Sequence, residues 1–208
     1  WRRMLNDPGP LDNFKASQAE QIVTEGFLHI LGWKFENRAL PQWIVERTGG
    51  HPAFVQCFCE RLQRRTANRQ DQMVRLDDVV AVFEDQDPNH SFIAYVKSNL
   101  EWNLRDPISR FLVLLLASES SQARGFTLAQ IRELARLSKT PIPESYLLRS
   151  LDTLAVNSVV KEFAPQVYEF SVPDYPLILE RLGQTQMGLT TLEQEIAPYL
   201  ELENGRNR

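Results

Sequence analysis

The sequence predicts a mainly α-helical protein that carries one small β-hairpin. Apolar residues recur with helical spacing along most of the 208 residues. Two β-prone runs, Val159–Phe163 and Val167–Val172, are joined by a short Ala-Pro-Gln segment and are typical of a hairpin. The chain is long enough for about one to two domains. A hydrophobic content of 43% with 24% charged residues is typical of soluble globular proteins.

The first predicted domain, residues 1–105, is a bundle of five helices. Ser17 has the form of an N-cap with Glu20 three residues later, so we expect a helix that begins there and ends at Gly32. Asp77 is expected to cap the fourth helix, and the residues before it could be extended. The other three helices are expected over Arg38–Arg47, Pro52–Arg65 and Ser91–Asn103.

The second predicted domain, residues 106–182, alternates helices with short extended segments. Asp106-Pro107 begins a strongly apolar helix, Thr127 caps the next, and a third covers Glu144–Asn157. The hairpin and one more helix follow. Helix, short strand, helix, turn, helix and hairpin is the order of a winged helix-turn-helix domain. We therefore expect a helical bundle followed by a winged helix.

The two ends of the chain carry less pattern than its middle. The tail, residues 183–208, contains a possible short helix over Thr191–Leu200. The chain begins at Trp1 without an initiator Met, and we expect it to be a piece of a longer protein. No apolar run approaches the roughly 18 residues of a membrane span. The two cysteines provide no disulfide framework, so we expect a cytoplasmic location.

No catalytic constellation can be found, so an enzymatic activity of the chain is uncertain. The sequence lacks an HExxH pair, His/Cys groups at metal-ligand spacing, a Gly-x-Ser-x-Gly elbow and a phosphate-binding P-loop. Cys57 and Cys59 lie two residues apart on a predicted helix. They therefore point about 200° apart around its axis. We expect neither a shared metal nor a disulfide between them, and we interpret both as small buried residues.

The most informative segment is Thr48-Gly49-Gly50-His51-Pro52, which lies between two predicted helices. The two glycines can end the first helix and Pro52 can open the second, which is sufficient as a purely structural explanation. Alternatively, the free N–H groups and partial positive charge of the second helix could face a bound group. The residues alone leave both explanations open.

The segment Ile44–Leu62 resembles the lid of STAND-type AAA+ ATPases. It matches their pattern of Ile, Thr-Gly-Gly-His-Pro, Gln, Cys and Leu at the family spacing. It departs from the pattern at Ala53, because its aromatic residue stands one place later, at Phe54. The resemblance covers about residues 11–105 specifically and the winged helix more loosely.

The resemblance implies a regulatory role that is not catalytic by itself. In such proteins the lid packs over a nucleotide that a separate P-loop core binds. Carried over to this sequence, Pro52 would contact the nucleotide, Gly50 would permit close approach, and His51 would be a polar contact. This chain lacks the P-loop, so ATP or ADP and Mg²⁺ are expected only with that core. The expected partners are the core or effector domain of the same protein, or another protein.

The alternative hypothesis is a DNA-binding winged helix, as in an origin-recognition-type initiator or a transcription regulator. The candidate docking or DNA contacts are Arg61, Arg64, Arg65, Arg149 and Lys161. Residues 1–105 contain 13 Lys/Arg and 14 Asp/Glu, and residues 106–208 contain 10 and 13. Neither half has the basic surplus of a protein that binds phosphate backbones. The predicted groove-reading helix also carries acids, so we expect protein docking rather than DNA binding.

Overall fold

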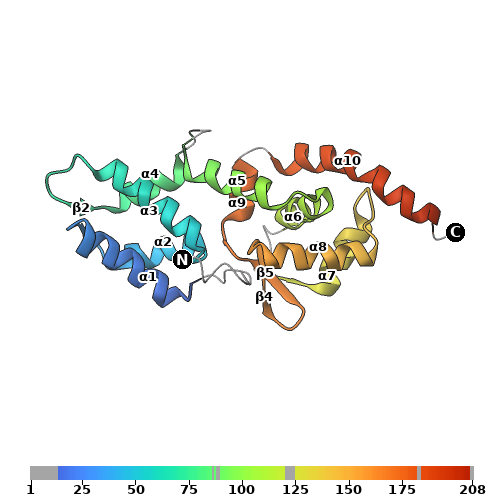
Figure 1. Ribbon diagram of the computed structural model, residues 1–208, viewed down its shortest axis with the longest axis horizontal. Coiled ribbons are helices and arrows are strands. Elements are labelled where there is room, and N and C mark those ends of the chain that lie inside the picture. The colour runs from blue at the N-terminus through green and yellow to red at the C-terminus, as the bar shows by residue number, and fades with distance from the viewer. Residues whose placement is uncertain (1–13, 86, 88–89, 120–124, 182–183, 207–208) are drawn as a thin grey trace, which may run out of the picture. The chain divides into compact units, whose positions relative to one another are not determined.

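A computed structural model of the chain describes residues 14–85, 87, 90–119, 125–181 and 184–206. It is mainly helical and contains a small antiparallel sheet (Figure 1), which confirms the predicted fold class at this level. The chain divides into two compact units, Trp1–Asn99 and Leu100–Arg208, called unit 1 and unit 2 below. The division lies inside a helix, α5 (Phe92–Asn103).

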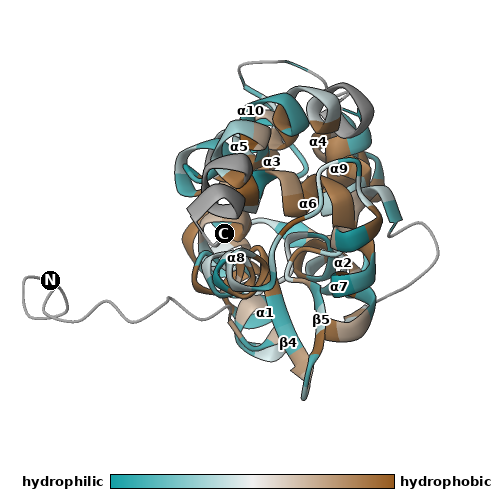
Figure 2. Ribbon diagram, turned by 90° about the vertical axis from the view of Figure 1, so that its right-hand side faces the viewer, coloured by the Kyte–Doolittle hydropathy of each residue, from teal (hydrophilic) through white to brown (hydrophobic). Residues whose placement is uncertain are grey.

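Unit 1 is a helical bundle with a two-residue parallel sheet. Its elements are α1 (Ala16–Glu25), the π-helical turn η2 (Gly26–Ile30), β1 (Lys34–Phe35), α2 (Ala39–Thr48), α3 (Pro52–Thr66), β2 (Met73–Val74), α4 (Leu76–Glu84) and the start of α5. Bands of apolar and polar residues alternate around the helices, as Figure 2 shows in brown and teal. The helices form because each buries such an apolar band against its neighbours.

Aromatic side chains pack against one another at the centre of unit 1. Phe92 of α5 lies edge-on to Phe54 and Phe58 of α3, with ring centroids 6.2 and 5.2 Å away. Phe83 of α4 lies 6.3 Å from Phe92. Phe54, Phe58 and Phe92 are fully buried. Aromatic pairs in such geometries stabilise a core by about 0.5–1.5 kcal/mol each beyond the burial of their area. This cluster fixes α3, the helix that follows the Gly-Gly-His-Pro segment.

Two predicted helix starts in unit 1 are wrong. The first helix begins at Ala16, before Ser17, and the side chain of Gln18 accepts a hydrogen bond from the Lys15 amide. The fourth helix begins at Leu76, so Asp78 rather than Asp77 occupies the third position. Its carboxylate accepts a hydrogen bond from the Arg75 amide at 2.9 Å. In both helices, the side chain at the third helical position accepts a hydrogen bond from the backbone amide of the residue that precedes the helix.

Unit 2 contains α6 (Pro107–Glu119), β3 (Phe126–Thr127), α7 (Leu128–Leu137), α8 (Glu144–Val156), β4 (Val160–Ala164), β5 (Val167–Phe170), α9 (Tyr175–Arg181) and α10 (Gln184–Arg206). The strongly apolar α6 contacts α7, α8, α9 and α10. The predicted tail helix is part of the longer α10. The predicted cap at Thr127 is confirmed, because its hydroxyl oxygen accepts a hydrogen bond from the Gln130 amide at 3.2 Å.

The sheet of unit 2 has three antiparallel strands in the order β3-β5-β4. The predicted hairpin is confirmed as β4 and β5, with Val160 opposite Phe170 and Lys161 opposite Glu169. Gln166 at its turn has φ +60, a left-handed conformation that suits a tight connection. The third strand, β3, pairs with β5 through Phe126 and Tyr168.

Candidate functional site

The segment between α2 and α3 is a tight left-handed joint. Gly49 and Gly50 have φ +61 and φ +67, which glycine adopts without the steric penalty of a side chain. The Gly50 amide donates to the Val45 carbonyl at 3.1 Å and so closes the end of α2. The buried Thr48 hydroxyl donates to the Ile44 carbonyl at 2.8 Å. The predicted helix ending at the glycines is therefore present, with its backbone groups paired.

Gly50 also lies against a segment from much earlier in the chain. The Phe14 amide donates to the Gly50 carbonyl at 3.0 Å. A Cβ atom added at Gly50 would lie 2.8 Å from the Phe14 carbonyl oxygen, closer than real Cβ contacts allow. Both the backbone angle and the neighbouring backbone thus require glycine here. The close approach at Gly50 is to the chain itself, and no pattern in the sequence indicates Phe14 as its partner.

His51 caps the start of α3 through its backbone and keeps a polar ring atom without a partner. Its carbonyl accepts hydrogen bonds from the amides of Phe54 and Val55, at 3.0 and 2.9 Å. Its ring stacks on Phe54, with centroids 4.2 Å apart and planes inclined by 27°. The Nδ1 atom is buried and has no hydrogen-bond partner among the described residues. Burial lowers the pKa of His51, so the ring is neutral at pH 7.

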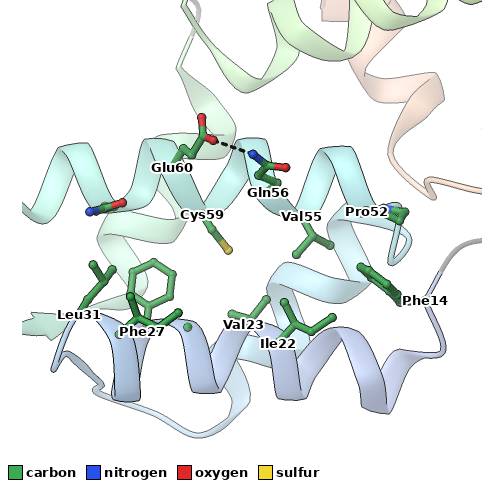
Figure 3. Close-up of a pocket in the computed structure, with 13 residues that line it drawn as sticks. Phe14, Ile22, Val23, Phe27, Leu31, Pro52, Val55, Gln56, Cys59 and Glu60 are labelled. Carbon is green, nitrogen blue, oxygen red and sulfur yellow. Dashed lines mark hydrogen bonds between the residues drawn. The ribbon is translucent and has the colours of Figure 1, made fainter. Parts of the chain in front are cut away.

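Pro52 begins α3 and lies at one end of an apolar groove. Figure 3 shows Pro52 and Phe14 together at this end, with α1 along one wall and α3 along the other. The groove has a volume of about 440 Å³. A proline at the first helical position loses no hydrogen bond, because its N–H would have had no partner in the helix. The joint and the groove are therefore continuous features of unit 1.

The predicted basic residues of α3 are partly engaged within unit 1. The Arg61 guanidinium donates to the His90 carbonyl at 2.7 Å and lies 5.9 Å from the Tyr95 ring centre. Arg65 lies 3.6 Å from the buried Asp78 carboxylate. Arg64 is exposed and makes no ion pair with a described residue. All three arginines line a hollow of about 490 Å³, which they share with the acidic Glu84 and Asp85.

Asp78 is the buried acid around which the basic residues gather. Its carboxylate forms a two-pronged pair with the Arg69 guanidinium, at 2.5 and 2.6 Å. It is fully buried, and it also accepts the Arg75 amide hydrogen bond that starts α4. This role was not expected from the sequence, where its signal is an acid three residues after Arg75, the spacing of a helix-start contact.

The two predicted basic residues of unit 2 lie among acids. Lys161 of β4 pairs with Glu169 of β5 at 2.9 Å. Arg149 is exposed on α8, where Asp152 follows it. The pKa of Tyr168 is raised mainly by burial and further by the negative charges of Glu162 and Asp152. Acids therefore lie close to Tyr168 and to both predicted basic residues.

The described residues form no group of three or more His, Cys, Asp or Glu side chains that could hold a metal ion. Burial raises the pKa of Cys57 to about 11 and that of Cys59 to about 12. Both thiols are thus protonated at neutral pH and unsuited to attack an electrophile. No helix in the described part of the chain is both long and apolar enough to cross a membrane.

Comparison of the chain with protein-family models, with curated proteins and with solved structures finds no match. The candidate site is therefore identified from its geometry alone. It combines a glycine in left-handed backbone, a histidine whose buried Nδ1 atom has no partner among the described residues, and a proline that opens a helix of 15 residues.

Proposed function

We propose that the chain is the regulatory lid and winged-helix region of a STAND-type AAA+ nucleotide switch, not catalytic alone and acting in the cytoplasm. The observation that carries this proposal is the His51 Nδ1 atom, buried without a described partner at the start of α3. A buried polar atom without a hydrogen bond destabilises a protein by about 1–3 kcal/mol unless another group satisfies it. A nucleotide held by a separate core domain would supply such a group.

The position of the joint supports the same proposal. Gly50 holds the backbone in a conformation that other residues adopt only with strain, and it orients His51 and Pro52 at the N-terminus of α3. A helix N-terminus favours negatively charged groups. ATP or ADP, with Mg²⁺, would be bound mainly by the P-loop of the core, and this chain would sense its presence. The partners of the chain are then that core, an effector domain of the same protein, or another protein.

The topology of unit 2 supports the proposed winged helix. The order α6, β3, α7, α8, β4, β5 follows the helix, strand, helix, helix, hairpin order of that domain. The short β3 adds to the hairpin at β5, so the sheet order is β3-β5-β4. In this proposal α8 is the helix that a DNA-binding relative would place in the major groove.

The charges on this face favour docking to protein over binding to DNA. Asp152 and Glu162 add negative charge around Tyr168, Asp152 follows the exposed Arg149 on α8, and Lys161 is paired with Glu169. A phosphate backbone would be repelled by the first two acids and would compete with Glu169 for the lysine. A mobility-shift assay at low salt separates the two hypotheses. We expect no retarded band, and tight binding that weakens steeply with salt would favour the DNA-binding alternative.

The nucleotide hypothesis is tested in the full-length protein by measuring ATP and ADP affinity with labelled nucleotide. The His51→Ala and Pro52→Ala variants should each bind nucleotide more weakly, because each loses one of the two proposed contacts. Pro107→Ala is the matched control, since Pro107 also is the first residue of a helix, α6, but lies in unit 2. The proposal also requires a P-loop within about 200 residues before Trp1, the span of one domain. Unchanged affinity in both joint variants, or the absence of a P-loop, would contradict it.

A second measurement tests the chain by itself. Calorimetric titration of the 208-residue chain with ATP should show weak binding or none, because the phosphate-cradling loop is absent from the sequence. Micromolar affinity would show that the chain binds nucleotide by itself. The proposal that a separate core domain binds the nucleotide would then be wrong.

A further inference from the structure

The groove between α1 and α3 contains apolar side chains that no described residue covers. Ile22 is 46% exposed and Ile30 is 83% exposed, although both line the groove. The other lining residues are Phe14, Val23, Gly26, Phe27, Leu31, Pro52, Val55, Gln56, Cys59, Glu60 and Gln63. Exposed apolar residues gathered in a hollow, unlike ones scattered singly, are typical of an interaction site.

The shape of the groove suits a helix. Its walls are themselves helical, with α1 and η2 on one side and α3 on the other (Figure 3). The α3 wall extends from Pro52 to Gln63, which corresponds to about three turns, or about 16 Å. An amphipathic helix lies in such a groove with anchors at positions i, i+3 or i+4, and i+7. Anchors at these positions span two turns, so the groove is long enough to hold them.

Two acids lie on the helices that form the groove, and one of them, Glu60, is part of its lining. Glu60 lines the α3 side, where its carboxylate accepts a hydrogen bond from the Gln56 side chain at 3.0 Å. Glu25 lies three residues after Ile22 on α1 and accepts a hydrogen bond from Gln21 at 2.8 Å. Neither carboxylate forms an ion pair with a described residue. Arg61, next to Glu60 in sequence, donates instead to the His90 carbonyl. Basic residues on an occupant would complement both acids.

We propose that this groove binds a short amphipathic helix of a partner protein, whose leucine or phenylalanine anchors are flanked by lysine or arginine. The apolar walls supply the binding energy, and Glu60 in the lining, together with the exposed Glu25 of α1, selects the charge of the flanks. This inference goes beyond the proposed nucleotide switch and does not depend on it, because its residues bind through their side chains and not through His51.

The test uses the full chain and two fluorescein-labelled helical peptides of about four turns, with binding followed by fluorescence anisotropy. Both peptides carry leucine anchors; one has lysine flanks and the other has glutamate flanks. We expect the lysine peptide to bind at least about tenfold more tightly at low salt, with the difference shrinking as salt is added. Glu60→Lys should reduce or reverse this preference.

Serine substitutions locate the site on the chain. Ile22→Ser and Ile30→Ser should each weaken binding of the lysine peptide by about tenfold, because each removes an apolar contact. Leu28→Ser is the matched control, since Leu28 is 42% exposed on η2 but does not line the groove. It should change affinity by less than about twofold. Circular dichroism confirms that each variant is folded.

Three results of the peptide experiments would overturn the proposal. The first is equal or tighter binding of the glutamate peptide, and the second is an equal loss of affinity in the Leu28 variant. The third is no binding of the lysine peptide at about millimolar concentration, the weak end of specific recognition. Sedimentation velocity adds a further check, because a dimer that Ile30→Ser dissociates would identify a second copy of the chain as the occupant instead.

Discussion

Two ion pairs of similar geometry lie in very different surroundings in the two units. In unit 1, Asp78 pairs with Arg69 at 2.5 Å, and its side chain is 1% exposed. In unit 2, Lys161 pairs with Glu169 at 2.9 Å, and the lysine side chain is 50% exposed. Removing one partner of a buried pair leaves an uncompensated charge without water, whereas water replaces a lost partner at the surface. Burial, rather than distance, decides which pair matters to stability.

The largest expected effect is therefore at Asp78. Asp78→Ala should lower the free energy of unfolding by about 3 kcal/mol, because it leaves the Arg69 guanidinium, which is 32% exposed, without its carboxylate and the α4 start without its acceptor. Asp77→Ala is the control, since Asp77 is exposed on the same turn, and its effect should stay below about 1 kcal/mol. Urea unfolding of both variants measures the difference. Equal effects would show that the buried network contributes no more than a surface charge.

Gly50→Ala should follow, with a loss of about 2–3 kcal/mol. A left-handed backbone destabilises a non-glycine residue by about 1–2 kcal/mol, and the contact of the new Cβ with the Phe14 carbonyl adds strain. Gly26→Ala provides the contrast, because Gly26 lies in right-handed helical backbone with no atom within 4 Å of the added Cβ. It should be neutral or stabilise by up to about 1 kcal/mol. A stable Gly50 variant would show that the joint can rearrange.

A smaller effect is expected from the protonation of His51. Because its pKa in the folded chain lies below the unfolded value, the unfolded state binds the proton more readily as the pH falls. Stability should therefore decrease from about pH 7.5 to pH 5, on both sides of the ordinary histidine pKa. The stability of the His51→Phe variant should decrease less over this pH range. The His29→Phe variant, changed at an exposed histidine, should lose as much stability as the parent chain. Unfolding measured at each pH gives the free energy of unfolding as a function of pH. If this curve for His51→Phe is parallel to that of the parent chain, the expectation is wrong.

The smallest effect is expected at the hairpin pair of unit 2. Lys161→Ala should change the free energy of unfolding by less than about 1 kcal/mol, as for other exposed ion pairs. Whatever effect there is should shrink in high salt, because mobile ions screen exposed charges. Thermal unfolding at low and high salt measures it. A loss similar to that at Asp78 would remove the distinction between the two pairs.

Much of the helical framework could be predicted because its signals are local. The Thr127 cap and the hairpin depend on residues a few positions apart, and the turn at Gly49 and Gly50 depends on the glycines themselves. The pairing of β1 with β2 could not be predicted, since two-residue strands carry no periodicity and Lys34 meets Met73 only after α2 and α3 have packed. The choice of Asp78 over Asp77 depends on the extended backbone of Arg75, which composition does not reveal.

The candidate site also contains residues that local sequence signals predict and residues that only tertiary packing brings together. His51 and Pro52 could be selected from the sequence because helix-breaking residues stand beside them. Phe14, which approaches Gly50 and lines one end of the groove, lies in another part of the chain and depends on the packing of α1 against α3. The groove has no sequence signal of its own, because it is a property of the surface that two helices leave between them.

The hydrogen bond between the Phe14 amide and the Gly50 carbonyl gives unit 1 a mechanical property. Tension applied at Phe14 would reach the joint through this bond, as well as through the packing of α1 against α2 and α3. The joint that orients His51 is thus also the anchor point for force that arrives along the preceding chain.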